Sequence, residues 1–182
     1  MDFFSAESKL STVIDPQMFV RTPGAPAAVG PQMIMHAAGF APAHKAGAPS
    51  TPLFAANGTA LHITLGEWEK ANGTVILRCV SGREQATSQL SGLLPGGHYS
   101  TFVVHLKAPS AKRFTPFGNA TGTTNNFTAS PQGTASPVNT VAGCLNSSNA
   151  VLIVWHSDGR SHGASPGAIG VTQHNSLITA IP

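Results

Sequence analysis

Apolar and polar residues alternate along several short stretches of this chain, and the alternation predicts β-strands. In the stretch 59–65, Leu61, Ile63 and Leu65 occupy every second position, which places them on one face of a strand. Strands are also predicted at residues 17–20, 74–80, 85–90, 99–106, 127–130, 133–138, 150–155 and 175–181. Short strands separated by turn signals indicate an all-β sandwich.

The predicted strands differ in how many of their faces are buried. Val75, Leu77 and Cys79 are expected to face the core, with the residues between them facing solvent. The run 150–155 is continuously apolar, which is typical of a central strand that is buried on both sides. In 99–106 apolar residues occupy both sets of alternate positions, so both faces of this strand are expected to be covered.

A tight corner interrupts the segment 90–106. Pro95 and the glycines Gly96 and Gly97 exclude a helix there, because proline lacks an amide donor and glycine is costly to order. The corner and the following Tyr99 form the pattern L-x-P-G-x-x-Y, which resembles the tyrosine corner of immunoglobulin-like and fibronectin type III sandwiches. The resemblance implies a Greek-key fold in which the phenol bonds to the backbone upstream.

Residues 1–50 differ in character from residues 51–182, which are assigned to the sandwich. Five prolines interrupt a run of alanine and glycine, so this segment is predicted to be an extended arm. A short helical turn is expected at 2–8 and a short strand at 11–15. The prolines are Pro23, Pro26, Pro31, Pro42 and Pro49.

The arm is too apolar for a free linker, since it contains Val29, Met33, Ile34, Met35 and Phe40. Two interpretations stay open. The arm covers its own sandwich, or it lies on a neighbouring subunit and adds a strand to an exposed sheet edge.

Charge is scarce, at 9% of the residues where about 25% is typical of globular domains. The net charge of +3 arises from scattered basic residues, and the pair Lys112-Arg113 is the largest cluster. This distribution argues against nucleic-acid binding. No stretch is long and apolar enough for a membrane span, and the first residues do not resemble a secretory signal. An export signal that was removed, or a virion protein that needs none, would account for that.

Two cysteines and several sequons indicate an extracellular or surface-exposed protein. Cys79 and Cys144 each lie beside a predicted strand, and we expect a disulfide between the two sheets. Sequons are candidate glycosylation sites, although Asn-Gly also marks hairpin turns. The candidate asparagines are Asn57, Asn72, Asn119, Asn126 and Asn146. Extracellular or surface-exposed localisation is therefore predicted.

The loop after the central strand carries the candidate chemistry. Its pattern H-x-D-G-x-x-H-G-x-x-P-G resembles an uncharacterised class of secreted bacterial domains, which implies a location for a site and no activity. His156, Asp158 and His162 are candidate ligands for copper or zinc, with His105 or His174 as a further ligand.

Two further patterns bear on chemistry. The corner before His98, followed by His105, resembles copper–zinc superoxide dismutase, but Val103 stands where that family has the first histidine of its His-x-His pair. Ser165 lies in a G-x-S-x-G match, yet Pro166 and the glycines after it exclude the helix that a nucleophile elbow requires.

A purely structural role for the loop is the favoured interpretation, with Asp158 capping a turn and Gly163 and Gly167 supplying positive φ angles. The predicted function is a non-enzymatic, surface-exposed structural module that self-associates through its arm and sheet edges, as a filament, virion or envelope-layer subunit, without a cofactor. The alternative is a secreted copper- or zinc-binding module. A third possibility, carbohydrate binding by the loop 107–126, depends on fold analogy.

Overall fold

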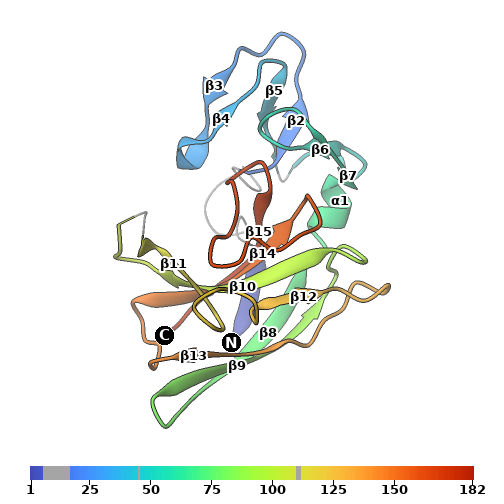
Figure 1. Cartoon of the computed structure of the whole chain (residues 1–182). Coiled ribbons are helices and arrows are strands. Elements are labelled where there is room, and N and C mark those ends of the chain that lie inside the picture. The colour runs from blue at the N-terminus through green and yellow to red at the C-terminus, as the bar shows by residue number, and fades with distance from the viewer. Residues whose placement is uncertain (6–16, 45, 110–111) are drawn as a thin grey trace.

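The computed structural model describes residues 1–5, 17–44, 46–109 and 112–182, and these residues are almost entirely β (Figure 1). The strands are β1 (Asp2–Ser5), β2 (Phe19–Arg21), β3 (Ala28–Val29), β4 (Met35–His36), β5 (Phe40–Pro42), β6 (Pro52–Phe54), β7 (Ala60–Thr64), β8 (Asn72–Val80), β9 (Arg83–Ser91), β10 (His98–His105), β11 (Phe114–Pro116), β12 (Asn126–Thr128), β13 (Val138–Ala142), β14 (Asn149–His156) and β15 (Gln173–Ala180). The helical elements are η1 (Pro31–Met33) and α1 (Leu65–Trp68). No helix of the described part is long and apolar enough to cross a membrane.

The body is a nine-stranded antiparallel sheet that is continuous through β1, and its two halves, here called sheets, form the layers of the sandwich. One, here called the β14 sheet, contains β11, β10, β14 and β15, with β12 also paired to β10; the other, the β8 sheet, contains β8, β9 and β13. The chain crosses between them from β9 to β10, returns at β13 and crosses again to β14. These crossings make the body an immunoglobulin-like Greek-key sandwich and confirm the predicted all-β fold class.

The core lies between the facing sides of the two sheets. Val75 and Leu90 of the β8 sheet belong to the same buried cluster as Val103, Val151 and Ile153 of the β14 sheet. Each of these positions is the inward half of a two-residue alternation. The pattern that predicted the strands is therefore the pattern that builds the core.

Strand β14 is buried along its whole length, as its apolar run predicted. It pairs with β10 on one side and β15 on the other. Leu152 and Val154 face outward and form a second apolar cluster with Phe102 and Val104 of β10. The covered outer face confirms that β10 is buried on both sides.

The predicted corner holds its expected bond. The Leu94 N–H donates to the Tyr99 hydroxyl oxygen at 2.9 Å, in a buried setting. Burial raises the pKa of the Tyr99 phenol, which therefore stays protonated. The turn at Pro95 and Gly96 thus fixes the passage from the β8 sheet to β10.

The first residues form a strand, and the predicted helical turn at 2–8 is wrong for the described residues 2–5. Strand β1 pairs with β15 on one side and with β8 on the other, so it links the two sheets. Both neighbours would otherwise present unpaired backbone groups at that position, and this pairing favours an extended conformation. The predicted strand at 11–15 lies outside the described residues.

The proline-rich segment is extended but folds back on itself. Strands β2 and β5 join β6 and β7 in a small sheet, and β3 pairs with β4 in a hairpin. The pairing of β2 with β6 runs across residue 50, so the stretch 59–65 belongs to the small sheet rather than to the sandwich. The division into an arm at 1–50 and a sandwich domain at 51–182 stays a prediction.

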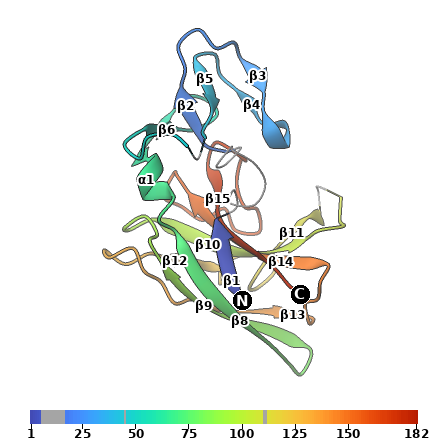
Figure 2. The same ribbon diagram turned by 180° about the vertical axis from the view of Figure 1, so that it is seen from behind.

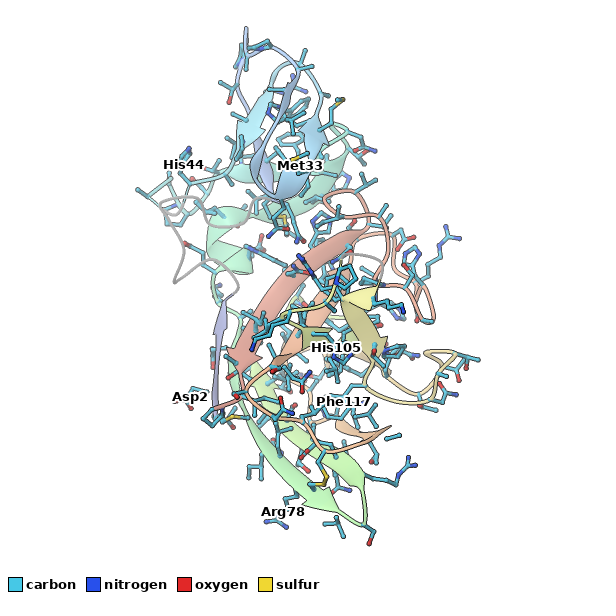
Figure 3. The ribbon with its side chains drawn as sticks, turned by 90° about the vertical axis from the view of Figure 1, so that its left-hand side faces the viewer. Asp2, Met33, His44, Arg78, His105 and Phe117 are labelled. Carbon is cyan, nitrogen blue, oxygen red and sulfur yellow. A yellow bond between two sulfur atoms is a disulfide. The ribbon has the colours of Figure 1, made fainter. Side chains whose placement is uncertain are left out.

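The disulfide is present between Cys79 and Cys144, with their Cα atoms 5.4 Å apart (Figure 3). Cys79 lies near the end of β8 and Cys144 follows β13, and β9 separates these two strands. The expected position between the two sheets is therefore wrong, because the bond staples one end of a single sheet. Both cysteines are exposed, so Cys79 does not face the core as predicted.

Candidate functional site

The candidate loop begins at His156, the last residue of β14. This side chain is 1% exposed, and its Nε2 lies 2.8 Å from the Ser100 Oγ of β10. Its Nδ1 is buried with no hydrogen-bond partner among the described residues. The pKa of His156 is lowered to about 4, chiefly by burial and also by nearby His162, while Asp158 opposes the shift. His156 is therefore neutral at pH 7.

Asp158 closes the loop through two partners. Its carboxylate forms an ion pair with Arg160, with Oδ2 3.3 Å from Nε, and lies 3.3 Å from Nε2 of His162. The rings of His156 and His162 approach to 5.3 Å between centroids. The loop therefore brings these three predicted residues together, and Gly163 adopts a positive φ of 64° that suits its turn.

The two further histidines lie elsewhere. His105 ends β10 and contacts Thr115, with its Nε2 2.9 Å from Oγ1, whereas His98 at the start of that strand is the register partner of His156. His174 is fully buried, with Nδ1 3.2 Å from the Gln17 carbonyl oxygen and Nε2 3.1 Å from the Ser157 Oγ. His174 therefore contacts the loop at Ser157, but among the described residues neither His105 nor His174 completes a metal-ligand group with His156, Asp158 and His162.

A metal ion does not fit this arrangement as it stands. Within residues 1–5, 17–44, 46–109 and 112–182, no three or more His, Cys, Asp or Glu side chains are placed to hold one. Nε2 of His156 is engaged by Ser100, and Nε2 of His162 is engaged by Asp158. The geometry instead suits hydrogen-bonded and ion-paired side chains that order a turn.

The serine pattern and the sequons have simple structural settings. Ser165 sits in a turn that no helix follows, and its Oγ accepts from the Gly167 N–H at 3.2 Å, so there is no nucleophile elbow. All five sequon asparagines are exposed. Exposure is required for glycosylation, which stays a prediction.

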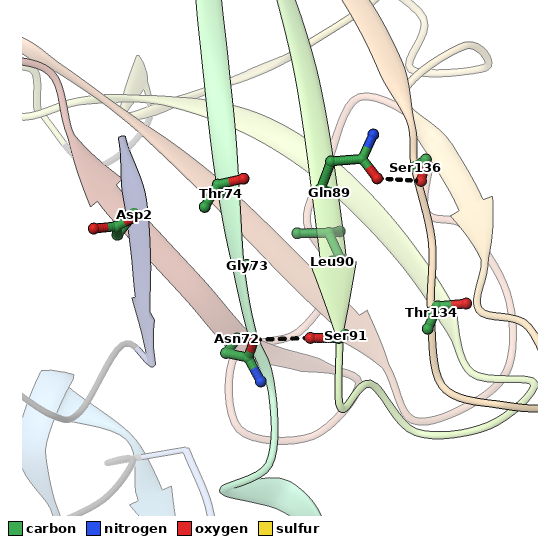
Figure 4. A pocket seen from close by; sticks show the side chains of 9 residues that line it. All are labelled: Asp2, Asn72, Gly73, Thr74, Gln89, Leu90, Ser91, Thr134 and Ser136. Atoms are coloured by element: carbon green, nitrogen blue, oxygen red, sulfur yellow. Dashed lines mark hydrogen bonds between the residues drawn. The ribbon is translucent and has the colours of Figure 1, made fainter.

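A polar hollow of about 760 Å³ lies on the outside of the β8 sheet (Figure 4). Asn72, Gln89 and Ser136 line it with uncharged side chains, and Asp2 supplies its one carboxylate. Ser91 donates to Asn72 and Ser136 donates to Gln89, each at 2.8 Å. These four side chains are therefore already paired, and no aromatic side chain lines the hollow for a sugar to stack on.

The β3–β4 hairpin presents apolar side chains to solvent. Val29, Met33 and Met35 are 55%, 86% and 71% exposed, and these three residues are called the hairpin patch below. Gln32 and Met33 hold φ angles of 55° and 62°, a conformation that costs about 1 kcal/mol or more for residues other than glycine. The fold therefore holds Met33 in solvent at a cost in backbone energy.

Beneath the hairpin, a groove of about 670 Å³ separates it from the outer face of the β14 sheet. Met33 lines one side, and Phe114, Leu152 and Ile178 line the other. The hairpin therefore covers part of its own sandwich while its tip remains exposed. The first interpretation of the arm, that it covers its own sandwich, therefore holds in part. The exposed apolar tip leaves the second interpretation, contact with a neighbouring subunit, open as a prediction.

Comparisons with known proteins leave the function open. No protein-family model and no curated protein matches the chain. Among solved structures, Cu/Zn superoxide dismutase from Brucella abortus is similar over 60% of this chain and 88% of its own length, at 16% identity and a TM-score of 0.38. Similarity at this level carries no functional argument.

The residue that sequence reasoning missed is Ser100, which lies beside His156 on the neighbouring strand. Its position follows from the register of β10 with β14, and no local motif marks it. The same register, which the sequence did not reveal, places the already noted His98 opposite His156. Ile76 faces solvent, as the alternation of β8 predicts, but sequence reasoning did not single out an apolar side chain at that exposed position.

Proposed function

We propose that this chain is a non-enzymatic, surface-exposed structural module that self-associates through its N-terminal hairpin. The observation that carries the proposal is the hairpin patch, where Val29, Met33 and Met35 are all more than half exposed on a projecting segment. Removing apolar surface from water releases about 25 cal/mol per Å², and contiguous apolar patches mark interaction sites.

The surroundings of the patch support association. Residues 22–35 contain no charged side chain, so the hairpin is free of the charge that edge strands commonly use to prevent pairing. The disulfide suits an oxidising compartment, which supports a secreted, virion or envelope-layer subunit. The few ionisable groups of the candidate loop are engaged in holding its turn, which supports a non-catalytic role.

Placing charge on the hairpin patch is the direct test. We expect the native chain to form species larger than a monomer as its concentration rises in sedimentation velocity, and we expect Met33→Lys/Met35→Lys to remain monomeric. Both methionines are exposed, so the variant should keep its melting temperature.

The matched control is Leu106→Lys, which charges an apolar side chain that is 49% exposed at the far end of β10. The control should assemble like the native chain. A native chain that is monomeric at every concentration, or a hairpin variant that still assembles, contradicts the proposal.

Copper or zinc binding at the loop is the second candidate, because His156, Asp158 and His162 are brought together there and a buried Nδ1 of His156 lacks a partner. It requires His162 to leave Asp158. We expect chelation to change neither particle size nor melting temperature. Stoichiometric metal in the purified protein, with a chelator-sensitive melting temperature that His162→Gln abolishes, would establish the second candidate instead.

A further inference from the structure

The outer face of the β8 sheet carries a second exposed apolar patch. Ile76 and Val138 are 56% and 58% exposed, and Thr87 lies between them as the register partner of both. Val80 continues the patch at the end of β8, with 66% of its side chain exposed. Ile76, Val80 and Val138 are called the face patch below.

The face patch is out of phase with the core pattern. Val75 points inward and is fully buried, so its neighbour Ile76 must point outward. On the solvent-facing side of an antiparallel sheet these positions are ordinarily polar. The next cross-strand pair on the same face, Thr74 and Gln89, is polar, as expected for a solvent-facing side.

The two apolar patches lie at opposite ends of the molecule. The β3–β4 hairpin projects at one end, and β8, β9 and β13 form the other end, with the body of the sandwich between them (Figures 1 and 2). Two different patches on well separated elements are suited to a head-to-tail contact. A head-to-tail contact that does not close into a ring produces an open polymer.

Charge favours this pairing over pairing of like with like. Arg78 lies between Ile76 and Val80 on the same face of β8, and Arg83 is the register partner of Val80. These exposed arginines would repel their counterparts if two such faces met. The hairpin carries no charge between residues 22 and 35, so it can approach the arginines without repulsion. The electrostatic cost is therefore lower for hairpin against face than for face against face.

The available area is also sufficient. The exposed fractions of the six side chains amount to about 700 Å² of apolar surface, close to the apolar share of a contact of about 1,200 Å² at the lower end of the stable range. A head-to-tail contact uses both patches of every copy and leaves no exposed patch inside a polymer.

We propose that the hairpin patch of one copy docks on the face patch of the next, so that the chain assembles head to tail. This inference rests on the proposed self-association and adds the surface that receives the hairpin. Each copy then contributes one hairpin and one face, and only the two ends of the assembly retain a free patch.

A complementation experiment tests the pairing. Met33→Lys/Met35→Lys keeps an intact face, and Ile76→Lys/Val138→Lys keeps an intact hairpin. We expect each variant alone to sediment as a monomer and the equimolar mixture to form a one-to-one dimer that grows no further. Leu106→Lys is again the control and should assemble fully.

Because lysine is disfavoured in strands, Ile76→Thr/Val138→Thr provides a version that retains β-branching at both positions. Its association should be weaker than that of the native chain by about tenfold or more, at an unchanged melting temperature.

The outcomes separate the two proposals. If the hairpin variant is monomeric but both face variants assemble normally, the head-to-tail pairing is overturned and self-association through the hairpin stands. If the two lysine variants are monomeric and their mixture stays monomeric, the pairing is likewise overturned. If the native chain never assembles, both proposals fall.

Discussion

Lowering the pH from 6.5 to 4 is expected to reduce the free energy of unfolding by several kcal/mol. The cause is a pair of buried, neutral histidines, His156 and His174, whose pKa values burial lowers from 6.5 to about 4. A shift of that size corresponds to about 3 kcal/mol for each group when fully expressed. Domains of this kind are stable by only about 5–15 kcal/mol in total, so the effect is large.

The sign follows from proton uptake. Between pH 6.5 and 4 the unfolded chain binds protons at both histidines while the folded chain does not, so protons favour unfolding across that interval. The stabilising contribution is complete above pH 6.5 and is lost as the pH falls toward 4. Below pH 4 the folded histidines also protonate, and their contribution to the slope disappears.

Urea denaturation at a series of pH values measures this directly. We expect His174→Gln to be less stable at pH 7 but to lose less stability on acidification, because glutamine does not titrate. The exposed His44 supplies the control, and His44→Gln should follow the native pH profile. A native profile that is flat between pH 6.5 and 4 would contradict the assignment of buried neutral histidines.

The strands of the sandwich could be predicted because the pattern of apolar and polar residues within each strand is sufficient to identify it. Alternation in β8 and β9 marks the inward residues, and the continuous apolar run of β14 marks a strand with two covered faces. The Tyr99 corner was predictable for a similar reason, since its turn chemistry is local in sequence.

The features that sequence reasoning missed depend on pairing between distant segments. Residues 2–5 become a strand only because β15 and β8 leave a position between them. Strand β7 lies within the predicted strand 59–65, but β6 was not predicted, and nothing local shows that β6 lies between β2 and β7. The same holds for the disulfide, whose position depends on β13 pairing with β9.

The loop histidines show how far the sequence alone predicts the candidate site. Sequence spacing placed His156, Asp158 and His162 together correctly, because all three belong to one turn. It did not reveal that Ser100 would engage His156, nor that His174 would be fully buried beneath the segment at Gln17. Burial depth decides whether a histidine is a ligand or a neutral core residue, and burial is a tertiary property.

Replacing both cysteines by serine should cost about 4 kcal/mol of stability and lower the melting temperature by about 10 °C. The bond between Cys79 and Cys144 spans 65 residues, and that loop contains β9 through β13. In the chain-entropy model, opening a loop of this length gives the unfolded chain many more conformations, while the exposed cysteines lose little packing in the folded state.

Urea denaturation of Cys79→Ser/Cys144→Ser beside the native chain measures the cost. The midpoint should fall, and the dependence of the unfolding free energy on urea should steepen, because the uncrosslinked unfolded chain exposes more surface. Native protein treated with a reductant should match the variant, which separates loss of the bond from any effect of the serines. A loss below about 1 kcal/mol would show that pairing of β9 with β8 and β13 already restrains these ends without the disulfide.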